Sequence, residues 1–376
     1  MEAATEEVRD LQDWEVLRRF LPPGWEEQAK KTGALKRARG VEDADTLLRM
    51  AMVHLVYGCS LVEAAARARE AGWARISSVA LYKRLRGAEQ WLRWLAEQVR
   101  TEKYGPFPRL ERVVRVVDAT TISEPGSTGT DWRVHYAVNL ANLQCDYFEL
   151  TDAGGGETAA RYPVSRGDVI LADRGYASAR GIEHVVGQGG DIIVRWRLTR
   201  PLLGKQGGPA DLLKLTAGLR VGQVRQVELA APAGDQPIPG RLIIVKRSRP
   251  AAERALKRIR DKLRKQRPMS KRVRRAAAYF FLWTSLKESD LAAPRVLEMY
   301  RLRWQIELVF KRLKSIMGLG HLPKKDPRSA RAWLHGKLLA GLLVERVIDA
   351  ASSFSPWGYP LEPAAEPMAR NRIHVP

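Results

Sequence analysis

The first 105 residues carry apolar side chains at the spacing of α-helices. Between residues 43 and 56, leucine, methionine and valine recur every three to four positions, as on the buried face of one helix. An alanine-rich helix is expected at 61–71, and Ser77 or Ser78 is placed to cap a further helix. We therefore predict an all-helical N-terminal domain over residues 1–105.

Two of these predicted helices, 61–71 and 77–86, are joined by a glycine-containing turn, which is the outline of a helix-turn-helix. The later helix carries aromatic and basic side chains suited to DNA contact: Tyr82, Lys83, Arg84 and Arg86. An ordinary helical bundle with a basic surface would show the same pattern. The sequence leaves both interpretations open.

A β-type pattern begins after Pro106 and Pro108, which punctuate a linker. Strands are predicted at residues 113–117, 132–140, 147–151, 168–172 and 191–198, with a helix at 182–186. The strand at 168–172 is almost entirely apolar, as is typical of a strand buried on both faces. Strands followed by helices indicate an α/β core.

Residues 200–250 are rich in glycine and proline, with strand-like pieces at 221–229 and 241–246, and they predict an inserted β subdomain. The next segment, 251–275, has twelve Lys or Arg against two acids, a net charge of +10. Part of it is predicted to be a helix, 252–266. Such a run is often a solvated face, but in so basic a chain we favour a surface that follows DNA. Beyond it we predict a strand at 279–285, a long helix at 292–315 and a core helix around 338–344.

Charge narrows the class of partner. The 376 residues contain 64 Lys or Arg and 42 Asp or Glu, giving a net charge of +22, which points to a polyanion and above all to nucleic acid. A ribosomal-type or solubility-driven basic surface is the alternative. Only two cysteines are present, no apolar run is long enough to span a membrane, and the acidic, polar start is no secretory signal. We expect a cytoplasmic, nucleoid-associated protein with no membrane partner.

Two aspartates, Asp118 and Asp173, are each expected where an apolar strand ends and a polar segment begins. In open α/β sheets that position faces the ligand crevice, and two carboxylates there can share divalent cations such as Mg²⁺. Each motif alone is weak, because an aspartate after a strand is often only a turn residue or helix cap.

The helix predicted at 292–315 strengthens the case for a phosphodiester site. Tyr300, Arg303 and Lys314 lie at −7, −4 and +7 from Glu307, within roughly 60° of one another on an ideal helix. The glutamate suits a metal ion, the arginine fork suits a phosphate, and the phenol and ammonium group can donate to phosphate oxygens. The alternative is a surface Arg303–Glu307 ion pair worth about 0.3–0.5 kcal/mol.

The spacing Tyr300-x2-Arg303-x3-Glu307-x6-Lys314 resembles the tyrosine–arginine–glutamate–lysine signature of the insertion-sequence-four family of bacterial transposases. The blocks VVDATTI, DWRVHYAVNL and LADRGYA resemble the segments around that family's two catalytic aspartates. The resemblance covers about residues 110–345. It implies a ribonuclease-H-like core interrupted by a β-rich insertion.

The resemblance also implies a chemistry. Asp118, Asp173 and Glu307 would hold two Mg²⁺ ions, with Mn²⁺ as a possible substitute. DNA would be held by Tyr300, Arg303, Lys314 and Arg174, and a flipped base would stack on Phe280 or Trp283, although core packing is as good an account of either aromatic ring. A dimer, formed on double-stranded DNA, would nick the terminal inverted repeats, pass through a hairpin intermediate and join the freed 3′-hydroxyl to target DNA.

We accordingly predict five segments: a helical, DNA-binding domain at 1–105, the first part of the catalytic core at 106–200, the β-rich insertion at 201–285, core helices at 286–350, and a tail or dimerisation element at 351–376. Three other interpretations remain: a catalytically silent DNA-binding regulator, another two-metal nuclease, and an RNA-binding protein. Four other acids could replace one of the proposed three: Glu124, Asp131, Asp146 and Asp152.

Overall fold

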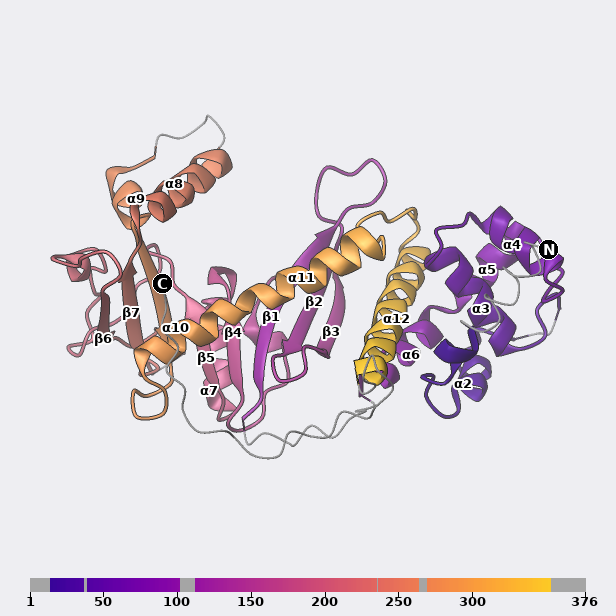
Figure 1. Cartoon of the computed structure of the whole chain (residues 1–376), viewed down its shortest axis with the longest axis horizontal. Helices are drawn as coiled ribbons and strands as arrows, with labels where there is room; N and C mark the ends of the chain where they lie inside the picture. The colour runs from indigo at the N-terminus through magenta and orange to yellow at the C-terminus, as the bar shows by residue number, and fades with distance from the viewer. Residues whose placement is uncertain (1–13, 37–38, 102–111, 235, 264–268, 353–376) are drawn as a thin grey trace.

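The structure is a computed structural model that describes residues 14–36, 39–101, 112–234, 236–263 and 269–352. The molecule is elongated, with N-terminal helices at one end and a long sheet filling the rest, and the long helix α12 (Pro327–Ser352) stands between them (Figure 1). The tail or dimerisation element predicted from residue 351 lies outside the described residues, apart from the end of α12.

The N-terminal helices begin where the sequence provides capping side chains. Asp43, Ser60 and Ser77 each accept a hydrogen bond from the backbone N–H three residues later. Ser60 also forms a capping box with Glu63. The helices are α2 (Trp25–Lys31), α3 (Ala44–Leu55), α4 (Leu61–Glu70), α5 (Ser78–Gly87) and α6 (Glu89–Thr101). The helical prediction is thus confirmed for the part of this segment that the structure describes.

One mixed sheet of eight strands organises the rest of the chain, so the predicted α/β class is confirmed. The strands run in the order β3-β2-β1-β4-β5-β8-β7-β6. Strands β1, β4 and β5 are parallel, and every other neighbouring pair is antiparallel. The strands are β1 (Val114–Ile122), β2 (Trp132–Asn139), β3 (Cys145–Asp152), β4 (Val169–Ala172), β5 (Asp191–Arg195), β6 (Val224–Glu228), β7 (Arg241–Lys246) and β8 (Tyr279–Thr284).

The strands predicted in the β-rich insertion are joined to the central sheet. The insertion supplies β6 and β7, of which β7 pairs with β8 over six residues, and β8 pairs with β5. The insertion therefore extends the central sheet. The physical reason is that β5 would otherwise leave an unpaired edge, which β8 covers. The basic helix α8 (Arg249–Leu263) and the short helix α9 (Lys271–Ala276) rise above this end of the sheet (Figure 1).

The sheet has an apolar core on each face. On one face Val117, Ala137 and Trp283 pack with Ile182 of helix α7 (Ala179–Gly187). On the other face the core continues into the N-terminal helices and the helices α10 (Ala293–Arg301) and α11 (Gln305–Lys311), which cross the sheet as a diagonal rod (Figure 1). Because β-strand side chains alternate between faces, every second residue of β1, beginning with Val116, faces this rod.

The long helix predicted at 292–315 is present but is not one regular α-helix. A 3₁₀ turn at Leu302–Trp304 separates α10 from α11, and a π-type turn at Arg312–Ile316 follows α11. The prediction that four signature residues share one face assumed a rotation of 100° per residue. That rotation applies only within the α-helical stretches α10 and α11. The core helix predicted around 338–344 is confirmed as part of α12.

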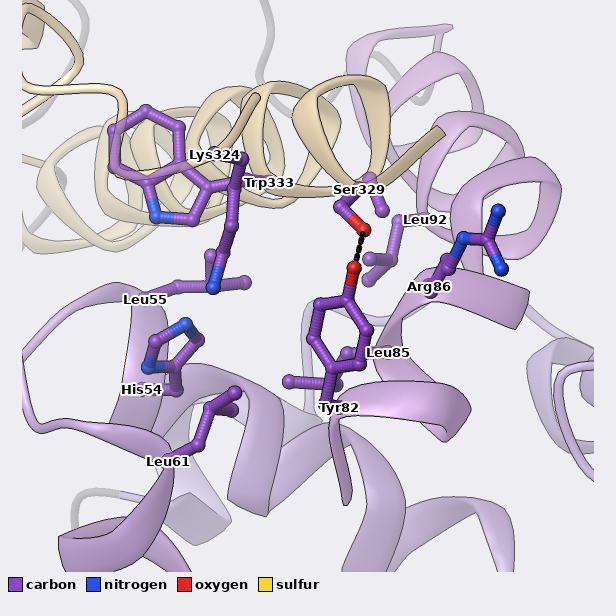
Figure 2. Close-up of a pocket in the computed structure, with 11 residues that line it drawn as sticks. His54, Leu55, Leu61, Tyr82, Leu85, Arg86, Leu92, Lys324, Ser329 and Trp333 are labelled. Atoms are coloured by element: carbon purple, nitrogen blue, oxygen red, sulfur yellow. Dashed lines mark hydrogen bonds between the residues drawn. The ribbon is translucent and has the colours of Figure 1, made fainter. Parts of the chain in front are cut away.

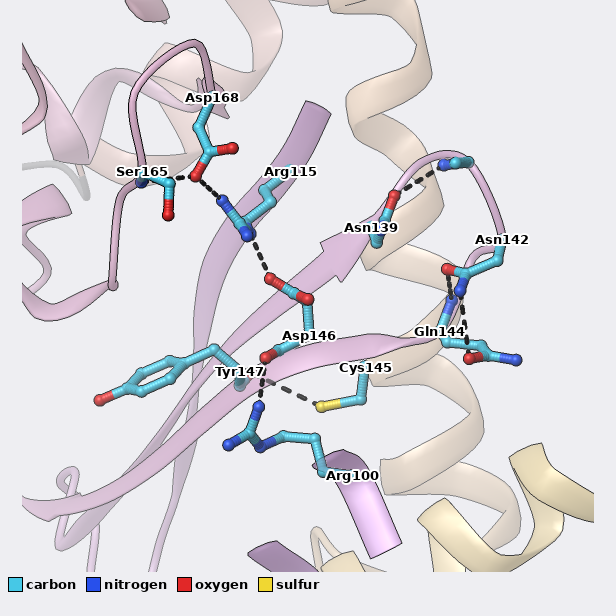
Figure 3. Close-up of polar contacts among 11 residues, drawn as sticks. Arg100, Arg115, Asn139, Asn142, Gln144, Cys145, Asp146, Tyr147, Ser165 and Asp168 are labelled. Carbon is cyan, nitrogen blue, oxygen red and sulfur yellow. Dashed lines mark hydrogen bonds and ion pairs between the residues drawn. The ribbon is translucent and has the colours of Figure 1, made fainter. Parts of the chain in front are cut away.

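Buried ionic contacts join the sheet to its surroundings. Arg115 of β1 forms ion pairs with Asp146 of β3 and with Asp168, and the Asp146 carbonyl accepts a hydrogen bond from Arg100 of α6 at 2.6 Å (Figure 3). Removing one partner of such a network would leave a buried charge without compensation. Among the described residues, no helix combines the length and apolar character needed to cross a membrane.

Candidate active site

Asp118 and Asp173 lie side by side where two parallel strands part. The pairing of β1 with β4 ends at Val117 and Ala172, and each aspartate is the next residue. Asp173 follows its strand as predicted. Asp118 does not end its strand, because β1 continues beside antiparallel β2 as far as Ile122. The predicted strand end at Asp118 is therefore wrong, although the predicted neighbourhood of the two acids is right.

The Asp118 side chain faces the long helical rod. Its direct partner across β1 and β2 is Tyr136, and opposite residues of an antiparallel pair project to the same face. The Tyr136 ring packs edge-on against Phe310 of α11 at 6.2 Å. This places Asp118 beneath the segment that carries Arg303 and Glu307.

Arginine side chains connect the three acids. The Arg303 guanidinium donates to Glu307 at 2.6 Å and lies 3.9 Å from an oxygen of Asp118. Arg195, the last residue of β5, lies 3.7 Å from Asp173. The two are neighbours because parallel strands β4 and β5 pair Ala172 with Val194, and Asp173 and Arg195 are the next residues. Arg303 thus stands between the first and third acids.

Asp118 lacks full compensation for its charge. Burial raises its pKa to about 6, against the lowering effects of the Ala119 N–H and Arg303, and Glu157 and Asp173 raise the pKa further. A carboxyl group in this state gains from any cation placed beside it.

Asp173 gives the second sign that a cation fits here. Its Oδ1 atom is buried and accepts no hydrogen bond from the described residues, and the Arg195 guanidinium lies 3.7 Å away. Carboxylate oxygens of this kind are the ligands that Mg²⁺ prefers. Among the described residues, no three acid, histidine or cysteine side chains already stand close enough together to hold a metal ion. Asp118 and Asp173 fit such an ion, and Glu307 would have to exchange its contact with Arg303 to join them.

Two further signature residues occupy different places. Tyr300 is 8% exposed, and its hydroxyl is buried without a hydrogen-bond partner among the described residues. Burial raises its pKa, and the Asp173 charge raises it further against the lowering effect of Arg303, so the hydroxyl keeps its proton. Lys314 lies beyond Asp118, where its ammonium group donates to the Thr121 carbonyl of β1 at 2.7 Å.

A groove of about 810 Å³ opens from the acids toward α8. Asp173, Arg303 and Glu307 line one end of it. Six more arginines line the remainder: Arg174, Arg195, Arg197, Arg247, Arg254 and Arg258. Only Arg174 of these six was proposed from the sequence, together with a general role for the basic segment. Arg195, Arg197 and Arg247 sit in or beyond strands and carry no local signal.

The two aromatic candidates for base stacking differ sharply. Trp283 is fully buried and donates to the Leu229 carbonyl at 2.8 Å, so it belongs to the core. Phe280 is half-buried beside Tyr300, with ring centres 5.6 Å apart, and the guanidinium groups of Arg195 and Arg247 each lie 5.6 Å from its ring. Of the two, Phe280 alone borders the site.

The four substitute acids have other contacts. Asp131 accepts from the Glu124 N–H, and Glu124 accepts from Trp132. Asp152 accepts from the Gly154 N–H, and Asp146 pairs with Arg115. The acid that sequence reasoning missed is Glu157, whose charge acts on Asp118.

Three of the four residues predicted for helix-turn-helix DNA contact, Tyr82, Arg84 and Arg86, contact other parts of the protein instead. Tyr82 accepts from Ser329 at 2.9 Å, and Arg86 pairs with Asp326 at 3.0 Å, so this side of α5 packs on the start of α12 (Figure 2). Arg84 donates to the Arg39 carbonyl. Lys83 and Arg86 are both exposed, and Arg86 is held by Asp326.

Comparison with known proteins agrees with this arrangement. The sequence model of a family described as the transposase DDE domain matches residues 109–343. The chain is 36% identical over 349 residues to the InsL transposase of insertion sequence element IS186A from Escherichia coli (strain K12), covering 89% of this chain and 93% of the relative. It is also 36% identical over 350 residues to the transposase of insertion sequence element IS421 from Escherichia coli, with the same coverage.

Among solved structures, the piggyBac transposase synaptic complex with hairpin DNA aligns with a TM-score of 0.47 and 10% identity, over 82% of this chain and 65% of that one. The chain belongs to the DDE transposases of bacterial insertion sequences, within the insertion-sequence-four family.

Proposed function

We propose that this chain is an active transposase that cuts the ends of its insertion sequence with Asp118, Asp173 and Glu307 and joins the freed 3′-hydroxyl to target DNA. One observation carries the proposal: Arg303 contacts both Glu307 and Asp118, and Asp173, Arg303 and Glu307 line an arginine-rich groove. The order β3-β2-β1-β4-β5, with β1 central and β4 parallel beside it, supports a ribonuclease-H-like core.

The groove would hold the DNA backbone. Its arginines can grip phosphates through paired N–H donors, and their charge draws a polyanion toward the acids. Burial lowers the pKa of Arg247 to about 10, with Arg195 and Arg258 lowering it further, so a phosphate would relieve repulsion among these three side chains.

We propose that Asp118, Asp173 and Glu307 hold two divalent cations, Mg²⁺ with Mn²⁺ as a substitute. When bound, such a pair activates the attacking oxygen and stabilises the leaving oxygen of an in-line displacement. Asp118 and Asp173 would supply ligand oxygens from the sheet, and Glu307 would supply one from α11. Because Arg303 holds Glu307 in the free protein, a phosphate that takes over the Arg303 fork would release Glu307 toward the aspartates.

Tyr300 and Lys314 would position the cleaved strand. The Tyr300 hydroxyl keeps its proton and would donate it to a phosphate oxygen held by the neighbouring Arg303. The hydrogen bond from Lys314 to Thr121 attaches the end of the helical rod to β1. It also keeps the Lys314 ammonium group, in addition to the Arg303 guanidinium, near Asp118. Water would act first as the nucleophile, and the released 3′-hydroxyl next, so no covalent protein intermediate is needed.

The remaining steps of the proposal follow the family. We propose a hairpin intermediate, with the flipped base beside Phe280, and a dimer that forms on two element ends. We also propose that residues 1–105 contribute to DNA binding and that the enzyme works at the bacterial nucleoid. The exposed Lys83 is the first residue of α5 to examine for DNA contact.

A cleavage assay tests the proposal. Wild type, Glu307→Ala and the control Asp152→Asn are each incubated with labelled duplex carrying the element's own end, with Mg²⁺ or with EDTA. We expect Mg²⁺-dependent nicking at the end by wild type and the control, and binding without nicking by Glu307→Ala. Binding without cleavage by wild type under several divalent metals would favour a silent regulator, and cleavage by Glu307→Ala would show that the third acid is misassigned.

A further inference from the structure

The segment between β3 and β4 brings a fourth acid, Glu157, to the two catalytic aspartates. A 3₁₀ turn separates Glu157 from Tyr162, whose hydroxyl donates to the Asp118 carbonyl at 3.1 Å. The same hydroxyl lies 3.3 Å from the hydroxyl of Tyr176. Tyr176 ends the short turn that Asp173 begins. The segment that starts at Glu157 therefore contacts the chain beside both aspartates.

The Glu157 side chain lies against that same turn. A Cβ placed on Gly175, two residues after Asp173, would collide with the Oε2 atom of Glu157. The carboxylate thus occupies the space that the missing side chain of Gly175 leaves beside the turn. After burial, the charge of Glu157 contributes most to raising the pKa of Asp118, ahead of the charge of Asp173. The backbone contacts, the side-chain contact and the electrostatics agree on one position for this acid.

The loop that carries Glu157 is held in place from behind. Arg133 of β2 donates to the Gly155 carbonyl, and Arg161 donates to the Gly156 carbonyl at 2.9 Å. Gly155 is itself buried, and a Cβ there would collide with a threonine side chain of β3. Because the two residues before Glu157 are fixed by these contacts, the fold determines where the acid stands.

Glu157 has no partner that would explain its place. Among the described residues, no group donates a hydrogen bond to its carboxylate, and no lysine or arginine forms an ion pair with it. Its side chain is exposed, so water reaches it. An unpaired acid beside Asp118 and Asp173 adds to the repulsion within the metal-free site, and a divalent cation would offset that repulsion.

We propose that Glu157 is a positioning residue of the active site, which accepts hydrogen bonds from the hydration water of a divalent cation held by Asp118 and Asp173. This inference rests on the proposed function for its cation. Mg²⁺ usually keeps several waters in protein sites, and groups that accept hydrogen bonds from the ligands of a metal raise its affinity. A place one water away agrees with the spacing of the acids, since no three such side chains among the described residues already stand close enough to hold a metal ion.

The test measures binding of Mn²⁺ to the full chain without DNA, so that no cleavage is required. The free ion is followed by electron paramagnetic resonance for wild type, Glu157→Gln, Glu157→Asp, Asp173→Asn and the control Glu183→Gln. Glu183 is an exposed acid of α7 whose carboxylate lies beside Gly234, so the control removes the same charge elsewhere. We expect the dissociation constant to rise about 10–100-fold for Glu157→Gln and to stay near wild type for the control. Glu157→Asp keeps the charge and should recover part of the affinity.

The variants separate this inference from the proposed function. Glu157→Gln that binds Mn²⁺ like wild type, while Asp173→Asn loses binding, would overturn the role of Glu157 and leave the aspartate site standing. Equal weakening by Glu157→Gln and Glu183→Gln would overturn it too, because the effect would be one of overall charge. Wild type that binds Mn²⁺ with the help of Glu157 but never nicks end-sequence DNA would defeat the proposed function and leave this role standing.

Thermal denaturation distinguishes a role toward the cation from a purely structural one. In EDTA, Glu157→Gln removes one of three neighbouring negative charges and should melt at or above the wild-type temperature. Added Mn²⁺ should raise the melting temperature of wild type more than that of Glu157→Gln, because the tighter-binding protein gains more from the ion. A Glu157→Gln protein that melts lower in EDTA and gains as much from Mn²⁺ as wild type would contradict the inference.

Discussion

Replacing Asp118 with asparagine should stabilise the metal-free protein while abolishing cleavage. The Asp118 side chain is 24% exposed, and its pKa rises from 3.8 to about 6 because burial penalises the charged form. Below pH 3.8 the carboxyl is protonated in both the folded and the unfolded chain, so it contributes no difference. As the pH rises to about 6, the unfolded chain releases the proton more readily, and stability falls.

The magnitude follows from the shift. At about 1.4 kcal/mol per pH unit, the folded protein loses about 3 kcal/mol by pH 7. Asparagine has the same shape, keeps an oxygen for the Ala119 N–H and carries no charge to desolvate. For a chain of 376 residues, about 3 kcal/mol corresponds to a melting temperature about 4 °C higher.

Thermal denaturation in EDTA between pH 5 and pH 8 measures the effect. The melting temperature of Asp118→Asn should exceed that of wild type by an amount that grows from pH 5 to pH 7 and then remains constant. Asp152→Asn, at an exposed site, should melt with wild type throughout. An Asp118→Asn protein that melts at or below the wild-type temperature at pH 7.5 would refute the reasoning, because Arg303 and Ala119 would then outweigh the desolvation of Asp118.

Substitutions at three other positions give separate checks. Arg115→Ala leaves Asp146 and Asp168 without their cation and should lower the free energy of unfolding by about 3–5 kcal/mol, measured by denaturant titration. Trp283→Ala should cost about 3–5 kcal/mol of stability by opening a cavity, whereas Trp283→Phe should fold and still bind DNA ends. Phe280→Ala should weaken binding of a hairpin-end DNA by about 1–3 kcal/mol with a smaller effect on melting, and equal loss of hairpin and duplex binding would argue against base stacking.

Local features of the fold were readable from the sequence because local interactions decide them. Ser77 caps α5, as one of the two predicted serines, and Ser60 caps α4 in the same way. The wrong prediction that the strand ends before Asp118 also has a local cause, because aspartate is depleted in strands. The residues that follow it, Thr120 and Ile122, keep their strand conformation through pairing with β2.

The site was predictable only in part. The three acids and the helix signature lie in recognisable blocks of sequence, and the fold brings Asp118, Arg303 and Glu307 together. Arg195 and Arg247 could not be assigned, because they meet at Phe280 only through the pairing of β5, β7 and β8. Such contacts depend on strands that are distant in the chain.

The π-type turn at Arg312–Ile316 has a consequence for how this helix tolerates insertions and deletions. A π-type turn holds one residue more than an α-helical turn, so a chain one residue shorter can close the turn as regular α-helix. Lys314 lies inside this turn, which makes its separation from Glu307 the adjustable part of the signature. We expect relatives to differ in length here before they differ between Arg303 and Glu307, and a motif search that demands one constant glutamate-to-lysine spacing would overlook them.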